Sequence, residues 1–145
     1  MTLYSFFKEF HSGFRYIVIV LVLLALIRAF MGWLGKRPYG EGNRKLNLFA
    51  MISVHTQFLL GIILFFISPM VQFSKETMKN PVTRYFTVEH WVMMVIAIAI
   101  ITVGHSKSKK LTVPQDKHKI IALFYTLALL IIIVALAAGK ISILK

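Results

Sequence analysis

The chain has 145 residues, of which 58% are hydrophobic, and 17 lysines and arginines against five acidic residues give it a formal net charge of +12. Such an apolar chain has too little polar surface for a water-soluble globule. Its long aliphatic runs also exclude a nucleic-acid-binding protein, which spreads its cations over helix faces. The chain has no cysteine, which excludes disulfides, thiolate metal sites and covalently attached c-type haem.

Four apolar segments are long enough to cross a bilayer, which takes about 20 helical residues. Their expected ranges are 16–34, 46–71, 86–103 and 120–138. Their apolar residues run without alternation, which excludes the strands of a membrane barrel. We therefore expect an all-α integral membrane protein, an up-down four-helix bundle that forms a single transmembrane domain over residues 1–145.

Helix-breaking residues separate the expected spans. Glycine and Pro38 mark the first connection, Pro69 ends the second span, and Pro81 precedes the third. A short interfacial turn is expected at residues 74–78. Pro114 is expected near the first position of the fourth helix, where its missing N–H costs nothing.

The distribution of lysine and arginine predicts the orientation. The first and third connections with their flanks hold ten of these residues, and the rest of the chain holds seven. Since cytoplasmic connections carry the excess of positive charge, we expect these two connections in the cytoplasm and both termini on the non-cytoplasmic side.

Function is best sought among polar side chains that the bilayer penalises. All five histidines lie in or beside the expected spans: His11, His55, His90, His105 and His118. Neutral imidazole is the commonest metal ligand and a standard axial ligand of haem iron. Helix bundles build such cofactor sites from side chains on facing helices.

His11 and His90 are expected at the same outer level, where they can face each other across a porphyrin. Arg15 is then placed to pair with a haem propionate, although an arginine at this depth also commonly reaches for lipid phosphates. His90 follows Glu89, so an interfacial Glu–His pair is the alternative to a ligand role. A quinone site near these two residues is a further interpretation.

The inner histidines are less clearly placed. His55, near the centre of the second span, is interpreted as a ligand or relay group, or else as a hydrogen-bond partner of a neighbouring helix. His118 is either a ligand or one more cation of a basic connection. Arg28 is the corresponding propionate partner, with the same alternative of snorkelling. His105, at the exit of the third span, is expected to be solvated.

One face of the second span carries small and polar residues. Ser53, Gln57 and Gly61 recur every four residues, a spacing that predicts close packing against another helix. His55 lies about 200° around the helix from Gln57 and so points elsewhere.

Three short segments carry a family resemblance: His11-Ser12…Arg15-Tyr16, Val54-His55…Leu60-Gly61 and Val88-Glu89-His90. They resemble small four-helix bacterial membrane proteins of the cytochrome b-like type. The segment from Val54 to Gly61 is also similar, more distantly, to the histidine helices of one half of haem A synthase. The resemblance implies haem b held by histidines and electron transfer at the bacterial inner membrane. That synthase has a glutamate three residues before its histidine, whereas Glu89 adjoins His90, so synthase catalysis is not carried over.

The leading hypothesis is a b-type cytochrome with one or two haems, an electron carrier rather than a stand-alone enzyme. In the two-haem version His11 and His90 hold the outer haem, and His55 and His118 hold the inner one. Its partners would be the bilayer and a membrane protein or quinone, with a homo-oligomer also open and nucleic acid excluded. The alternative is a cofactor-free accessory subunit of a larger membrane complex, in which the histidines join helices by hydrogen bonds.

Overall fold

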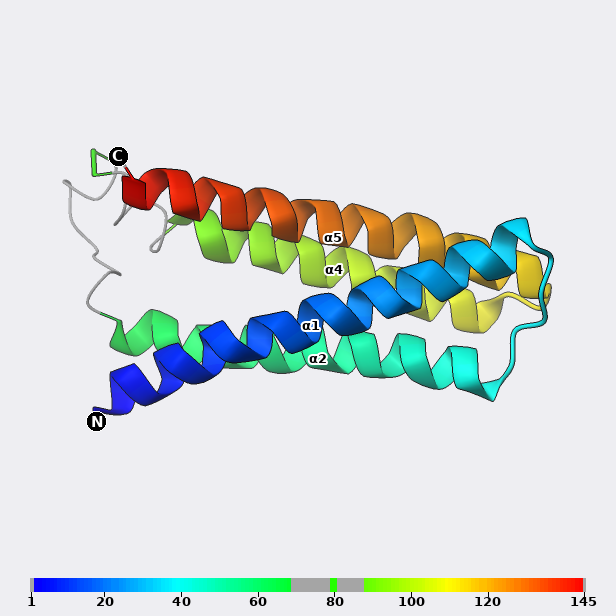
Figure 1. The fold of residues 1–145 in the computed structure, drawn as a ribbon, viewed down its shortest axis with the longest axis horizontal. Helices are drawn as coiled ribbons and strands as arrows, with labels where there is room; N and C mark the ends of the chain where they lie inside the picture. Colours follow the sequence, from blue (N-terminus) through cyan, green and yellow to red (C-terminus); the bar gives the residue numbers. More distant parts are fainter. Residues whose placement is uncertain (1, 69–78, 81–87, 145) are drawn as a thin grey trace.

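The computed structural model describes residues 2–68, 79–80 and 88–144. These residues form four long helices and no strand: α1 (Leu3–Leu34), α2 (Glu41–Ile67), α4 (His90–Lys110) and α5 (Pro114–Leu144). The helices run alternately up and down, and α1 begins at the same end of the bundle at which α5 finishes (Figure 1). The expected all-α four-helix bundle is confirmed.

Each of the four helices is long and apolar enough to cross a membrane. Many of their large apolar side chains face outward. Leu34 is 72% exposed and Phe66 78% exposed, for example, while much of the buried core is built from alanine, valine and glycine. A water-soluble bundle has the opposite distribution, with large side chains inside. The chain is thus a multi-pass membrane protein, and its outward-facing side chains meet lipid.

Helix α1 extends well before the span expected from residue 16. Thr2 caps it, since the Thr2 hydroxyl accepts from the Ser5 N–H at 3.1 Å and the Ser5 hydroxyl accepts from the Thr2 N–H at 3.1 Å. This capping box satisfies two backbone donors that the first turn leaves unpaired. As a result, His11 and Arg15 lie within the helix and not before it.

The other boundaries follow the breaker residues. Helix α2 begins after Gly40 and ends at Ile67, so the part of the expected span beyond Ser68, and the turn expected at 74–78, lie outside the described residues. Helix α4 begins at His90 and α5 at Pro114, the position expected for that proline.

Small residues let the helices pack closely. Helix α1 turns a buried stripe toward its neighbours at helical spacing: Val18, Val22, Ala25, Leu26, Ala29 and Gly32. In α4, Gly104 lies so close to Phe124 of α5 that a Cβ on the glycine would overlap the phenylalanine side chain. Membrane helices lack a hydrophobic drive toward one another, and close contact at small residues replaces it.

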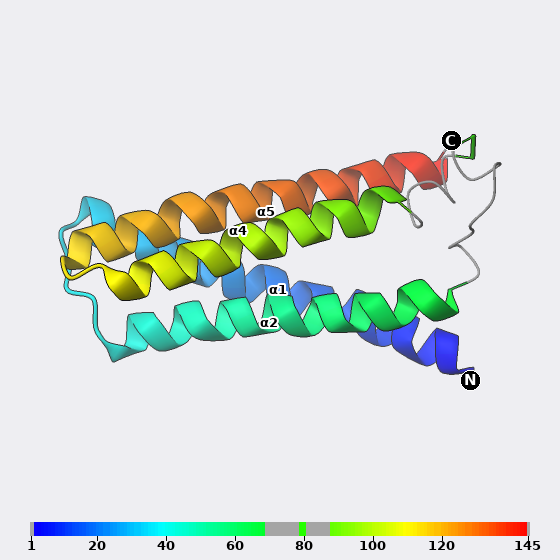
Figure 2. The same cartoon turned by 180° about the vertical axis from the view of Figure 1, so that it is seen from behind.

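The bundle does not have the same shape at its two ends. Each helix packs on two neighbours, in the cyclic order α1, α2, α4, α5. Helix α1 runs obliquely, beside α5 at the end that holds residues 35–40 and 111–113, and away from α5 toward the end that holds the termini (Figures 1 and 2). We call these the loop end and the terminal end. The expected histidine pair lies at the terminal end.

Candidate functional site

His11 and His90 face each other across the diagonal between α1 and α4. Their ring centroids are 6.3 Å apart and the ring planes are inclined by 72°. The two rings come together because His11 lies in the third turn of α1, while His90 is the first residue of α4 at the same end. The sequence predicted this meeting from the equal depth of the two residues.

Helix α2 supports His11 with the face that the sequence singled out. Gly61 lies against the His11 ring, and a Cβ built on this glycine would be 3.5 Å from His11 Nε2. The Gln57 side-chain nitrogen donates to the His11 carbonyl oxygen at 2.8 Å, and Ser53 is buried. The predicted close packing of this face is confirmed. The Gln57 Oε1 atom is buried and accepts no hydrogen bond from the described part of the chain.

An arginine and an aromatic pair come from residues near His11 and His90. The Arg15 guanidinium lies within electrostatic reach of both imidazoles and donates to the Tyr16 hydroxyl at 3.2 Å. Trp91, which follows His90 in α4, packs edge to face with Phe65 of α2 at 6.2 Å between centroids.

His55 has a partner on the neighbouring helix. Its ring nitrogen Nε2 lies 2.8 Å from the Thr102 hydroxyl of α4, and that hydroxyl donates to the Ile98 carbonyl oxygen at 2.6 Å. With its proton committed to Ile98, the Thr102 oxygen accepts, so Nε2 of His55 is the donor. The interhelical hydrogen bond named as the alternative for His55 is present, on an exposed side of the bundle.

His118 is buried at the loop end and is only 1% exposed. Its ring lies directly over Gly32 of α1, where any Cβ would overlap it, and its Nε2 donates to the Pro38 carbonyl oxygen at 3.1 Å. The Tyr39 ring packs on it edge to face at 5.1 Å between centroids. The His118 side chain is therefore packed inside the bundle and not on the surface of the basic connection. His118 and His55 share no partner among the described residues. Their pairing as ligands of an inner haem therefore stays a prediction.

A buried polar network joins α2, α5 and the first connection, and sequence reasoning missed it. The Tyr125 hydroxyl donates to the Asn47 carbonyl oxygen at 2.8 Å, and the Asn47 amide donates to the Tyr39 hydroxyl at 3.0 Å. Burial raises the pKa of Tyr39, so this hydroxyl stays neutral at physiological pH. The feature of the sequence that could have revealed this network is Tyr125, a tyrosine within the apolar run of the fourth span.

His105 is buried and not solvated as expected, with only 1% of its surface exposed. The close approach of α4 to α5 at Gly104 carries the next residue into the bundle, and the Ser108 hydroxyl donates to the His105 carbonyl oxygen at 2.6 Å. Neither ring nitrogen has a hydrogen-bond partner among the described residues. The position of His105 at the end of its helix predicted a solvated side chain, and that prediction is wrong.

Comparison with known proteins gives no relative: no family model, no curated protein and no solved structure matches this chain.

Proposed function

We propose that this protein is a membrane b-type cytochrome in which His11 and His90 are the two axial ligands of one haem at the terminal end. The observation that carries the proposal is the opposed ring pair, with centroids 6.3 Å apart. A ring nitrogen lies about 1 Å from the ring centre and binds a first-row metal at about 2 Å, so two rings on opposite sides of one metal ion place their centroids about 6 Å apart.

The number of protein ligands also favours a macrocycle. Among the described residues, no group of three or more histidines and carboxylates could hold a metal ion by itself. Two histidines on opposite sides suffice when a porphyrin provides the four remaining nitrogens. Bound haem would supply reversible one-electron chemistry at its iron.

The surroundings of the pair fit such a group. Helix α1 diverges from α5 toward this end (Figure 1). Gly61 keeps the α2 side of His11 free of bulk, and Phe65 and Trp91 offer apolar ring surfaces. Arg15 is the residue that would pair with a propionate. The buried Gln57 Oε1 is an acceptor next to the His11 helix turn, of the kind that orients a ligating imidazole through its second nitrogen.

The biological role that follows is electron transfer within or across the bacterial inner membrane, with a membrane protein or a quinone as redox partner. The excess of lysine and arginine in the first and third connections supports a cytoplasmic loop end. The haem would then lie near the non-cytoplasmic face of the membrane. This proposal concerns the His11–His90 pair alone; His55 and His118 each donate from Nε2 to a protein acceptor.

The test is the absorption spectrum of the purified protein after expression with ample haem. We expect a Soret band that changes on reduction, strongly diminished or shifted to a five-coordinate form in His11→Ala and in His90→Ala. His55→Gln is the matched control, since it removes a span histidine outside the site. A wild-type protein without a Soret band would favour the cofactor-free subunit instead, for which the hydrogen bonds of His55 and His118 to protein acceptors already give structural roles.

A further inference from the structure

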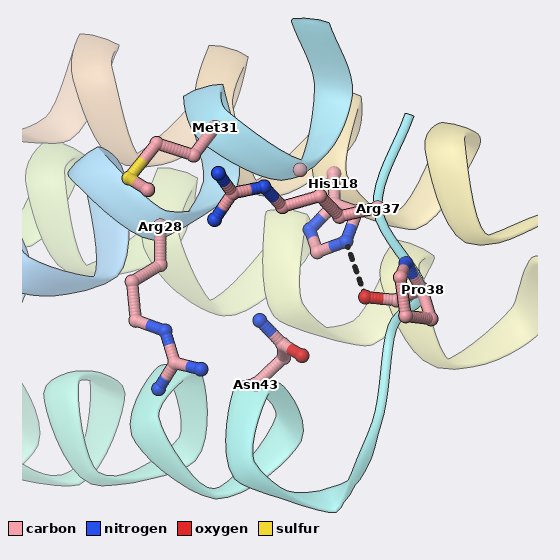
Figure 3. A pocket seen from close by; sticks show the side chains of 7 residues that line it. Arg28, Met31, Arg37, Pro38, Asn43 and His118 are labelled. Atoms are coloured by element: carbon pink, nitrogen blue, oxygen red, sulfur yellow. Dashed lines mark hydrogen bonds between the residues drawn. The ribbon is translucent and has the colours of Figure 1, made fainter. Parts of the chain in front are cut away.

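The loop end of the bundle holds a pocket of about 230 Å³ that the proposed haem site does not use. Its walls come from the last turns of α1, the connection after it, and the first turns of α2 and α5 (Figure 3). Two arginines, Arg28 and Arg37, line it together with Asn43 and His118, and no acidic residue is among its lining residues.

The groups that line the pocket are arranged as donors. Figure 3 shows the guanidinium groups of Arg28 and Arg37 on two sides of a space, with the Asn43 amide nitrogen pointing between them. The Asn43 Oδ1 atom is fixed by the backbone N–H of Gly40 at 3.0 Å, which leaves the amide hydrogens of Asn43 to the pocket. The ion pair present in the described part of the chain, Arg44 with Glu41, involves neither pocket arginine.

Buried contacts form the floor of the pocket. The His118 ring fills the space over Gly32 and is tied to the Pro38 carbonyl oxygen at 3.1 Å. That bond holds the connection after α1, which carries Arg37, close to α5. The position of the Arg37 guanidinium is thus coupled to the buried contact between His118 and Gly32, although Arg37 itself is an exposed side chain.

We propose that this pocket binds the phosphate group of an anionic ligand. Guanidinium groups match the oxygens of phosphate two at a time, and a converging amide adds a third donor. The pocket lies where the apolar helices end, which is the level of lipid headgroups. Basic pockets between membrane helices commonly bind the headgroups of anionic lipids at that level. The phosphate comes either from such a headgroup or from a soluble phosphate, and the experiment separates the two sources.

The experiment uses the detergent-solubilised full chain, titrated separately with short-chain phosphatidylglycerol, short-chain diacylglycerol and inorganic phosphate. The proposal expects saturable binding of phosphatidylglycerol and much weaker binding of diacylglycerol, which has no phosphate. Inorganic phosphate that binds as tightly as the lipid would identify a soluble ligand. Equal binding of the two lipids would overturn the proposal, and so would the absence of saturable binding by both phosphate probes.

Two double variants complete the test. Arg28→Gln with Arg37→Gln should raise the apparent Kd about tenfold or more, because each charge-assisted contact is lost. Lys36→Gln with Lys45→Gln removes the same two charges from the same end, outside the pocket lining, and should leave Kd within about twofold. If the arginine double variant loses its helical circular dichroism, Arg37→Gln alone is used, since that residue is exposed in a connection. An equal loss of binding in both double variants would contradict a built site.

Discussion

The imidazole ring of His118 in α5 lies on Gly32 of α1, in the space where a Cβ would stand. The ring fits only because residue 32 has no side chain. Through the His118–Pro38 hydrogen bond, this contact also positions the connection that follows α1. A single glycine therefore controls the geometry of the loop end.

The first prediction concerns this contact. Gly32→Ala should displace the His118 ring and destabilise the protein by about 1–3 kcal/mol, the usual cost of overpacking a close contact. Gly13→Ala is the control on the same helix, because a Cβ there has no neighbour within 4 Å and alanine favours the helix. Equilibrium unfolding in mixed micelles measures both. A Gly32→Ala protein as stable as the control would contradict the packing, and His118→Ala should restore part of the loss.

The second prediction concerns the contact between α2 and α4. Thr102→Val and His55→Gln each break the bond from His55 Nε2 to the Thr102 hydroxyl. Each should cost about 0.6 kcal/mol, the average for interhelical hydrogen bonds in membranes. The double variant should cost less than the sum of the two single changes, as measured by unfolding in mixed micelles. Strict additivity would mean that the bond contributes nothing.

The third prediction concerns the buried network at Asn47. Tyr125→Phe removes the side-chain hydrogen bond that the buried Asn47 carbonyl oxygen accepts in addition to its place in α2, and should cost about 0.5–1.5 kcal/mol. Tyr16→Phe is the comparison, since Tyr16 is 62% exposed and its hydroxyl meets only Arg15 in the described structure. A difference of less than about 0.5 kcal/mol between the two variants would show that the Tyr125 bond is not a stabilising contact.

The fourth prediction concerns orientation and uses the absence of cysteine from the chain. Thr112→Cys lies in the connection between α4 and α5, and Lys79→Cys lies between α2 and α4, at the other end of the bundle. In intact cells, a membrane-impermeant maleimide should label Lys79→Cys and not Thr112→Cys if the loop end is cytoplasmic. The reverse labelling pattern would invert the proposed orientation.

The features of this structure that could be predicted from the sequence are those that follow from the need to cross a bilayer. Continuous apolar runs must become helices, and breaker residues must end them, so the four helices and the start of α5 at Pro114 could be predicted. The meeting of His11 and His90 followed from their equal depth near the starts of two helices that run in the same direction, and the packing of Gly61 followed from small-residue spacing.

The environments of the other histidines could not be read in the same way. His105 stands at a helix end rich in lysine, yet it is buried next to the place where Gly104 lets α4 approach Phe124 of α5. His118 depends on a glycine in the first helix, and no local pattern links the two. Such contacts depend on how closely one helix approaches another. Hydropathy and residue spacing along a single helix do not predict that distance.

Imidazole rescue is the measurement that tests the proposed ligation most directly. His90→Gly removes one proposed axial ligand and leaves room for a small molecule between α1 and α4. Added imidazole should restore the wild-type oxidised and reduced spectra of His90→Gly and, likewise, of His11→Gly, and it should leave His55→Gly unchanged. Wild-type spectra in His90→Gly without imidazole, or a wild-type protein that binds no haem at all, would contradict the account.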